Sequence, residues 1–129
     1  MKKLLFKAFA ALTLLVAVTS CSKNKSEIIA KSWKGTELEV AGGTKLSADD
    51  IGGVNYTFNQ DGSFTYTEAA KTHDGTWSLN EDGSKLTLVY EEENRTVEQQ
   101  IKELSEEKMI IHGVEHGMER TVTLIPENK

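Results

Sequence analysis

The segment that decides the fold reads Val-Asn-Tyr-Thr-Phe-Asn-Gln-Asp-Gly-Ser-Phe-Thr-Tyr-Thr-Glu over residues 54–68. Apolar and polar residues alternate on both sides of Asn59–Gly62, which is typical of two half-buried strands. Gly62 supplies the positive φ that a loop of this kind demands. The segment therefore predicts a hairpin of strands Val54–Phe58 and Ser63–Glu68 with one shared apolar face.

Short strands separated by turn signals continue on both sides of this hairpin. We expect six more strands, at Trp33–Val40, Gly75–Leu79, Lys85–Glu91, Arg95–Glu103, Lys108–Val114 and Glu119–Ile125. Asn80–Gly83 repeats the first loop, and residues 69–73 are expected to form a looser one. Ser47–Asp50 is expected as one helical turn or a loop. A short helix over residues 27–31, capped by Ser26, precedes the first strand.

Eight strands with short connections, except between the first two, favour antiparallel neighbours. Such a meander can close into an up-and-down barrel, which removes exposed strand edges. A two-sheet sandwich is the main alternative, but the absence of long crossovers favours the barrel. We therefore expect an all-β fold, an eight-stranded antiparallel up-and-down β-barrel with a short N-terminal helix. The polar outward faces argue against a membrane pore.

The N-terminus has the pattern of a secretory signal: Lys2 and Lys3, an apolar run Leu4–Val18, then small residues before Cys21. Val18-Thr19-Ser20-Cys21 resembles the lipobox of bacterial lipoproteins, a family in which the signal is cleaved before the cysteine and its thiol carries diacylglycerol. The alternative is an ordinary secretory peptide with a chance cysteine. A membrane-spanning helix would need about 20 apolar residues.

These features predict a signal peptide over residues 1–20, a lipidated Cys21 with a tether to residue 26, and one domain over residues 27–129. Once residues 1–20 are removed, 12 basic residues face 20 acidic ones, a net charge of −8. This charge argues against nucleic acid as a partner. Because Cys21 is the only cysteine, a lipidated chain has no thiol left for a disulfide.

Three stretches resemble the lipocalin-like lipoproteins of Bacteroidetes-type bacteria: residues 56–64, 75–79 and 82–88. The resemblance implies a lipocalin-like barrel on an outer-membrane lipid anchor. Ser22–Lys25 lacks the acidic residues of the surface-export signal in such lipoproteins, which favours a periplasm-facing domain. The sequence departs from the better-known lipocalins at two points. Lys31-Ser32-Trp33 has lysine where their Gly-x-Trp pattern has glycine. Arg120 is the only late arginine that could lie across that tryptophan, as an arginine usually does in those proteins.

No set of residues marks a catalytic site, so we expect no enzymatic activity and no cofactor. His73, His112 and His116 are expected at the surface, without a metal site, because metal centres need three or four ligands in a defined geometry.

Six aromatic residues share the inward side of the expected strands: Tyr56, Phe58, Phe64, Tyr66, Trp77 and Tyr90. An eight-stranded barrel is wide enough either to be filled by such side chains or to hold one small ligand. The first alternative is a solid core. The second is a narrow apolar cavity with tyrosine hydroxyls at its mouth, which suits a small hydrophobic or amphipathic ligand.

Two hypotheses of function follow. The first is a lipid-anchored cell-envelope protein that binds such a ligand in its barrel. The second is a solid barrel that acts through its loops on another envelope protein, and the long connection Ala41–Gly53 is its best candidate surface.

Overall fold

A computed structural model describes residues 25–115 and 117–127 of the chain. Residues 25–29 are helical, and a 3₁₀ turn η1 covers Ala48–Ile51. The strands described are β1 Ser32–Val40, β2 Lys45–Ser47, β3 Val54–Phe58, β4 Ser63–Glu68, β5 Lys71–Leu79, β6 Lys85–Tyr90, β7 Arg95–Leu104, β8 Met109–Glu115 and β9 Met118–Pro126.

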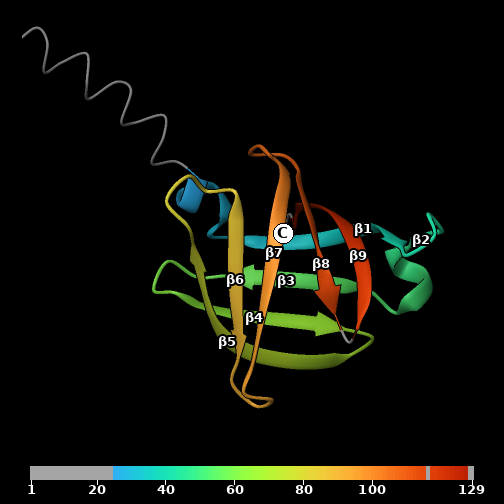
Figure 1. The fold of residues 1–129 in the computed structure, drawn as a ribbon, viewed down its shortest axis with the longest axis horizontal. Coiled ribbons are helices and arrows are strands. Elements are labelled where there is room, and N and C mark those ends of the chain that lie inside the picture. The colour runs from blue at the N-terminus through green and yellow to red at the C-terminus, as the bar shows by residue number, and fades with distance from the viewer. Residues whose placement is uncertain (1–24, 116, 128–129) are drawn as a thin grey trace, which may run out of the picture.

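Antiparallel pairing runs from β1 through β3 to β9 in chain order, and β9 pairs back onto β1. These eight strands close the barrel seen in Figure 1. The predicted eight-stranded up-and-down barrel with a short N-terminal helix is therefore confirmed. Closure gives every barrel strand two neighbours, so the backbone groups of the wall are paired within the sheet.

The connection between β1 and β3 holds a ninth strand that the sequence pattern did not predict. β2 pairs with the second half of β1, from Glu37 to Glu39, while β3 pairs with the first half, from Ser32 to Lys34. η1 follows β2 and confirms the helical turn expected near residues 47–50. Gly42, Gly43, Gly52 and Gly53, which flank this β2–η1 segment in pairs, all have positive φ angles.

Three other boundaries differ from the prediction. β5 begins at Lys71, so the expected loop at residues 69–73 is wrong, and a tight turn at Ala69 and Ala70 takes its place. The helical residues are 25–29 instead of 27–31, so Ser26 lies inside the helix and accepts the backbone hydrogen bond of Ala30. Lys25 donates from Nζ to the carbonyl of Asp82 at 2.7 Å, which holds residues 25 and 26 against the barrel instead of in a free tether.

The two similar loops predicted from sequence have the same geometry. Ser63 donates its backbone N–H to the carboxylate of Asp61 at 2.9 Å, and Ser84 does the same to Asp82 at 3.0 Å. In each loop the glycine, Gly62 or Gly83, has a positive φ. Hydrogen bonds from these serines hold the pKa of both aspartates below their usual range.

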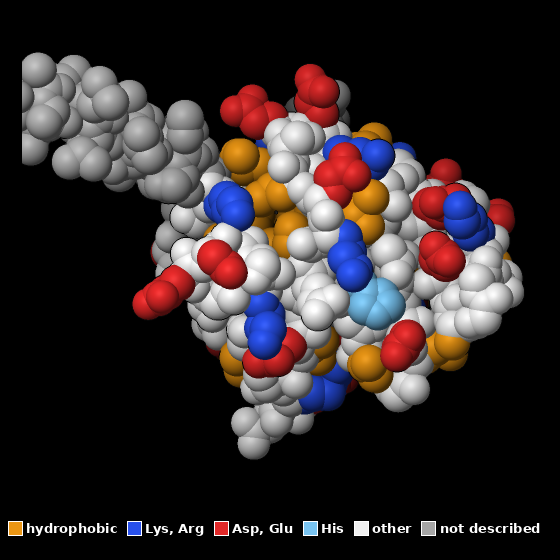
Figure 2. Space-filling model, turned by 45° about the horizontal axis from the view of Figure 1, so that its top comes forward, with side chains coloured by type: hydrophobic (Ala, Val, Ile, Leu, Met, Phe, Trp, Pro, Cys, Tyr) orange, Lys and Arg blue, Asp and Glu red, His pale blue; other side chains and the backbone are white. Residues whose placement is uncertain are grey.

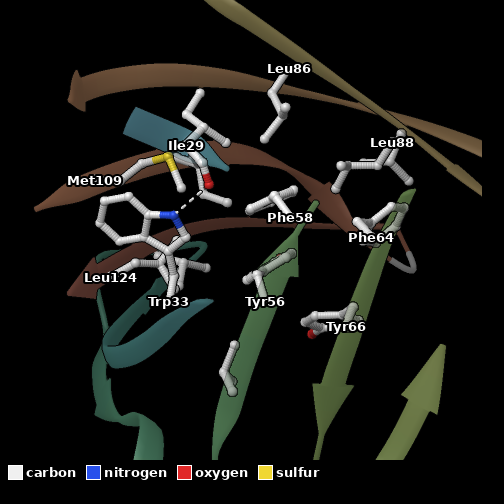
Figure 3. Packing of buried hydrophobic residues seen from close by; sticks show 14 of the residues in the cluster. Ile29, Trp33, Tyr56, Phe58, Phe64, Tyr66, Leu86, Leu88, Met109 and Leu124 are labelled. Carbon is white, nitrogen blue, oxygen red and sulfur yellow. Dashed lines mark hydrogen bonds between the residues drawn. The ribbon is translucent and has the colours of Figure 1, made fainter. Parts of the chain in front are cut away.

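One end of the barrel, which we call the helix end, is closed by apolar packing. The indole of Trp33 is fully buried and donates from Nε1 to the carbonyl of Ile29 at 2.9 Å. Figure 3 shows Met109 and Leu124 beside this indole. The helix thus covers the apolar floor of the barrel.

The outer wall carries charged side chains of both signs, with small apolar areas between them (Figure 2). Within the part of the chain that the structure describes, no helix is long and apolar enough to cross a bilayer.

Candidate ligand site inside the barrel

The six aromatic candidates all belong to the barrel wall, but they lie in two groups. Phe58 and Trp77 pack edge to face at 5.4 Å, and Trp77 is half-buried and donates to the carbonyl of Asn59 at 2.8 Å. This places them at the helix end. Tyr56, Tyr66 and Tyr90 gather toward the opposite end. Phe64 lies between the groups, with its ring centroid 6.1 Å from Phe58 and 5.3 Å from Tyr90.

Five of these six side chains are almost fully buried and pack on one another. Tyr56 is 0 % exposed, and its ring lies 4.6 Å from that of Tyr66 and 5.6 Å from that of Phe58. Tyr66 in turn packs against Tyr90 at 6.2 Å. The aromatic wall therefore fills this part of the interior as a core, in line with the solid-core alternative.

The end opposite the helix is polar inside, and we call it the polar end. Glu115, the last residue of β8, has a side chain that is only 2 % exposed. Its carboxylate accepts from Arg95 Nη1 at 3.3 Å, Gln99 Nε2 at 3.2 Å and the Tyr90 hydroxyl at 3.3 Å. The guanidinium of Arg95 also lies over the Tyr90 ring at 4.4 Å and pairs with Glu93. A charged carboxylate can be buried in this way because it is paired with a cation and accepts hydrogen bonds.

A second ion pair lies at the same end. Arg120 at the start of β9 donates from Nη1 to the carboxylate of Glu68 at 3.2 Å, and from Nη2 to the Tyr66 hydroxyl at 3.0 Å. Tyr66 in turn donates to Glu68. The Arg120 side chain is 11 % exposed, so this pair too is largely withdrawn from water.

Three buried polar atoms at this end have no hydrogen-bond partner within residues 25–115 and 117–127: the Tyr56 hydroxyl, Nδ1 of His73 and Nε of Arg120. His73 stacks on Tyr66 with ring centroids 6.1 Å apart and meets Tyr90 edge to face at 6.0 Å. Buried polar groups are nearly always hydrogen-bonded, so these three atoms are candidate contacts for a bound group.

Burial raises the pKa of the Tyr56 hydroxyl well above its usual range, and Tyr90 and the carboxylate of Glu115 raise it further. Burial likewise raises the pKa of Tyr90, again with a contribution from Glu115. Both hydroxyls therefore stay protonated at any physiological pH, so the Tyr56 hydroxyl can donate a hydrogen bond, as the Tyr90 hydroxyl already does to Glu115.

Two inward-facing glycines make room for this arrangement. A Cβ on Gly113 would lie 2.5 Å from Oε1 of Gln99, the side chain that donates to Glu115. A Cβ on Gly75 would lie 1.8 Å from the backbone carbonyl of Val89 and 2.8 Å from the Phe64 ring. The close approach of strands and side chains at these points requires glycine.

The sequence prediction missed most of the polar site. His73 was expected at the surface, which is wrong, because its ring stacks inside the barrel between Tyr66 and Tyr90. Glu115 lies just beyond the predicted strand Lys108–Val114 and is instead the buried last residue of β8. Arg120 does not lie across Trp33, because it binds Glu68 at the polar end, while Lys31 lies 4.8 Å above the Trp33 ring.

The other candidates from the sequence fall elsewhere. His112 is half-buried, and its Nδ1 is hydrogen-bonded to the Thr121 hydroxyl at 2.7 Å. His116 and Cys21 lie outside the described residues. Among the described residues, no three His, Cys, Asp or Glu side chains are grouped as a metal site. A surface hollow of about 680 Å³ lies on the outer wall beside Lys85, Glu98 and His112.

A closed antiparallel barrel of eight strands, with an apolar floor and a hydrogen-bonding cluster inside its other end, defines a small up-and-down β-barrel protein with a polar interior site. The chain belongs to the lipocalin-like domain family, whose sequence profile matches residues 24–111.

Two solved structures are similar in fold. One is a redesigned beta barrel, with 12% sequence identity and a TM-score of 0.52, and the match covers 81% of this chain and 96% of that one. The other is a protein from Burkholderia xenovorans solved by NMR, with 13% identity and a TM-score of 0.51, covering 84% of this chain and 89% of that one. At these identities the likeness concerns the fold alone. No curated protein matches the chain.

Proposed function

We propose that this protein is a lipid-anchored binding protein of the bacterial cell envelope that holds a small amphipathic ligand at the polar end of its barrel. The observation that carries the ligand site is the group of three unpartnered polar atoms, on Tyr56, His73 and Arg120, inside an aromatic wall. Such a site offers an apolar surface for one part of a ligand and hydrogen-bonding groups for another.

The ligand reaches the site through the polar end. Glu68 and Arg95 keep 31 % and 28 % of their side chains exposed there, whereas the Tyr56 hydroxyl behind them is buried. Glu68 and Arg95 are therefore the more exposed members of the two ion pairs. The aromatic rings below them form the inner boundary of the site.

The proposed location in the cell envelope rests on the lipobox-like residues around Cys21. Acylation at Cys21 would anchor the chain, since each buried methylene contributes about 0.8 kcal/mol and more than one acyl chain gives stable membrane binding. We place the domain at the outer membrane, facing the periplasm, in a binding role without catalysis.

In cells labelled with radioactive palmitate, the wild-type chain should take up label and sediment with membranes, and Cys21→Ser should do neither. Label retained by the variant would refute the anchor.

The binding proposal is tested by native mass spectrometry of the Cys21→Ser chain purified from the cells that produce it. We expect a species heavier than the polypeptide by the mass of one small molecule, which is lost on unfolding. A polypeptide that carries no added mass, and takes up no amphipathic probe in solution, would refute the proposal.

A second function is favoured by the β2–η1 segment. All three residues of β2 are exposed, Leu46 is 36 % exposed, and among the described strands β2 pairs only with β1. A free strand edge can add a strand from a partner protein. Replacing residues 43–52 with a short turn tests this alternative: proteins that co-purify with the wild-type chain should be lost, and unchanged partners would count against it.

A further inference from the structure

The ion pairs at the polar end hold more negative than positive charge. Arg95 faces Glu115 at 3.3 Å and Arg120 faces Glu68 at 3.2 Å, so each guanidinium has its own carboxylate. Glu93 adds a further negative charge at 2.7 Å from Arg95. This cluster therefore has no uncompensated positive charge to receive an anion.

The unpartnered atoms have a definite donor and acceptor character. Nε of Arg120 can only donate, whereas the Tyr56 hydroxyl and the ring nitrogen of His73 can each donate or accept. A ligand group that accepts two hydrogen bonds and donates a third offers one partner to each of the three atoms. Alcohols and primary amides have this combination.

From these two observations we infer that the ligand is an amphipathic molecule whose polar end is uncharged, an alcohol or an amide on an apolar body. The inference rests on the proposed function and adds the chemical class of the ligand. A carboxylate would bring a further negative charge beside Glu115 and Glu68 without a free cation. An ammonium has no lone pair to accept the hydrogen bond that Nε of Arg120 can donate. Burying an unpaired ion is far more costly than burying a hydrogen-bonded neutral group.

The outer-wall hollow beside Lys85 and Glu98 is not the candidate site for this ligand. These two side chains are 45 % and 61 % exposed and pair with each other at 3.6 Å. The unpartnered buried atoms of the described residues all lie on other strands, inside the barrel.

The test compares four eight-carbon probes that differ only in the polar end: octan-1-ol, octanamide, octanoate and octylammonium. Their affinities for the Cys21→Ser chain are measured by calorimetry at about pH 8, where octanoate and octylammonium are fully ionised. We expect the alcohol and the amide to bind at least about tenfold more tightly than either ion. Octanoate binding as tightly as octanol would overturn the inference and leave the binding proposal standing. If none of the four binds, the binding proposal fails, and this inference fails with it.

Two variants test whether the unpartnered atoms cause the preference for an uncharged ligand over an ion. Tyr56→Phe removes the unpartnered hydroxyl, and Arg120→Lys keeps the charge opposite Glu68 but removes Nε. Each should bring the ratio of octanol to octanoate affinity toward one. Thr76→Val, an exposed position on the outer side of β5, is the matched control and should leave that ratio unchanged. An unchanged ratio in both interior variants, with both folded, would overturn the inference.

Discussion

At the scale of single residues, two tyrosines of the polar end should respond in opposite ways to the same substitution. The hydroxyl of Tyr56 is buried without a partner, whereas that of Tyr90 donates to Glu115 at 3.3 Å. A buried unsatisfied polar group costs about 1–3 kcal/mol, and a hydrogen bond to a charged group contributes about 1.5–3 kcal/mol.

We therefore expect Tyr56→Phe to raise the free energy of unfolding by about 1 kcal/mol and Tyr90→Phe to lower it by about 2 kcal/mol. Urea denaturation of the ligand-free Cys21→Ser chain measures both. If Tyr56→Phe destabilised the fold as much as Tyr90→Phe, the Tyr56 hydroxyl would have a partner and the proposed site would lose its basis.

A second residue-scale prediction concerns the buried carboxylate. Glu115→Gln should lower the free energy of unfolding by about 2 kcal/mol, because the three donors around Glu115 lose their charged acceptor. Glu98→Gln is the matched control, since its exposed ion pair with Lys85 should contribute less than about 1 kcal/mol. Equal effects of the two changes in denaturation curves would show that Glu115 is solvated in solution.

At the scale of elements, the turn between β4 and β5 is built from residues that ordinarily avoid its geometry. Ala69 and Ala70 have φ angles of 53° and 69°, as in the tight hairpin turns that favour Asn-Gly. An alanine held at positive φ costs about 1 kcal/mol, and glycine relieves that cost.

Ala70→Gly should therefore raise the free energy of unfolding by about 0.5–1 kcal/mol in thermal or urea denaturation. Ala41→Gly is the control. Ala41 lies in a turn but is not among the described residues with a positive φ, so glycine there should lower the free energy of unfolding by adding backbone freedom. A loss of stability in both variants would contradict the turn geometry.

The turn at Ala69 and Ala70 also shows which part of the fold could not be predicted from the sequence. The barrel wall follows from alternation around Tyr56, Phe64 and Leu88, whose inward parity the structure confirms. The start of β5 could not be predicted, because residues 69–74 lack both an apolar alternation and a turn residue such as Gly or Asn. The polar site was missed for a related reason. Glu115 and Arg120 stand at strand ends, where charged side chains ordinarily face water, and only the closed barrel turns them inward.

At the scale of the whole molecule, the buried tyrosines give stability a dependence on alkaline pH. Burial raises the pKa of both Tyr56 and Tyr90 above the value of about 10 expected in the unfolded chain. Above about pH 10 the unfolded chain loses these protons while the folded one keeps them, so unfolding becomes easier as pH rises.

Each tyrosine should lower the free energy of unfolding by up to about 1.4 kcal/mol per pH unit in this range, with no effect below about pH 9. Denaturation curves of the wild-type and Tyr90→Phe chains, recorded below about pH 9 and above about pH 10, measure the difference. Parallel pH profiles for the two chains would mean that Tyr90 titrates normally and is not buried.

The central claim is that the polar end of the barrel is a ligand site. The most direct measurement is NMR chemical-shift mapping of the isotope-labelled Cys21→Ser chain titrated with octan-1-ol. The account predicts that the largest shifts fall on Tyr56, His73 and Arg120 and on the strands beside them. Shifts confined to the exposed residues of β2 or to the outer wall around Lys85, with the interior signals unchanged, would contradict it.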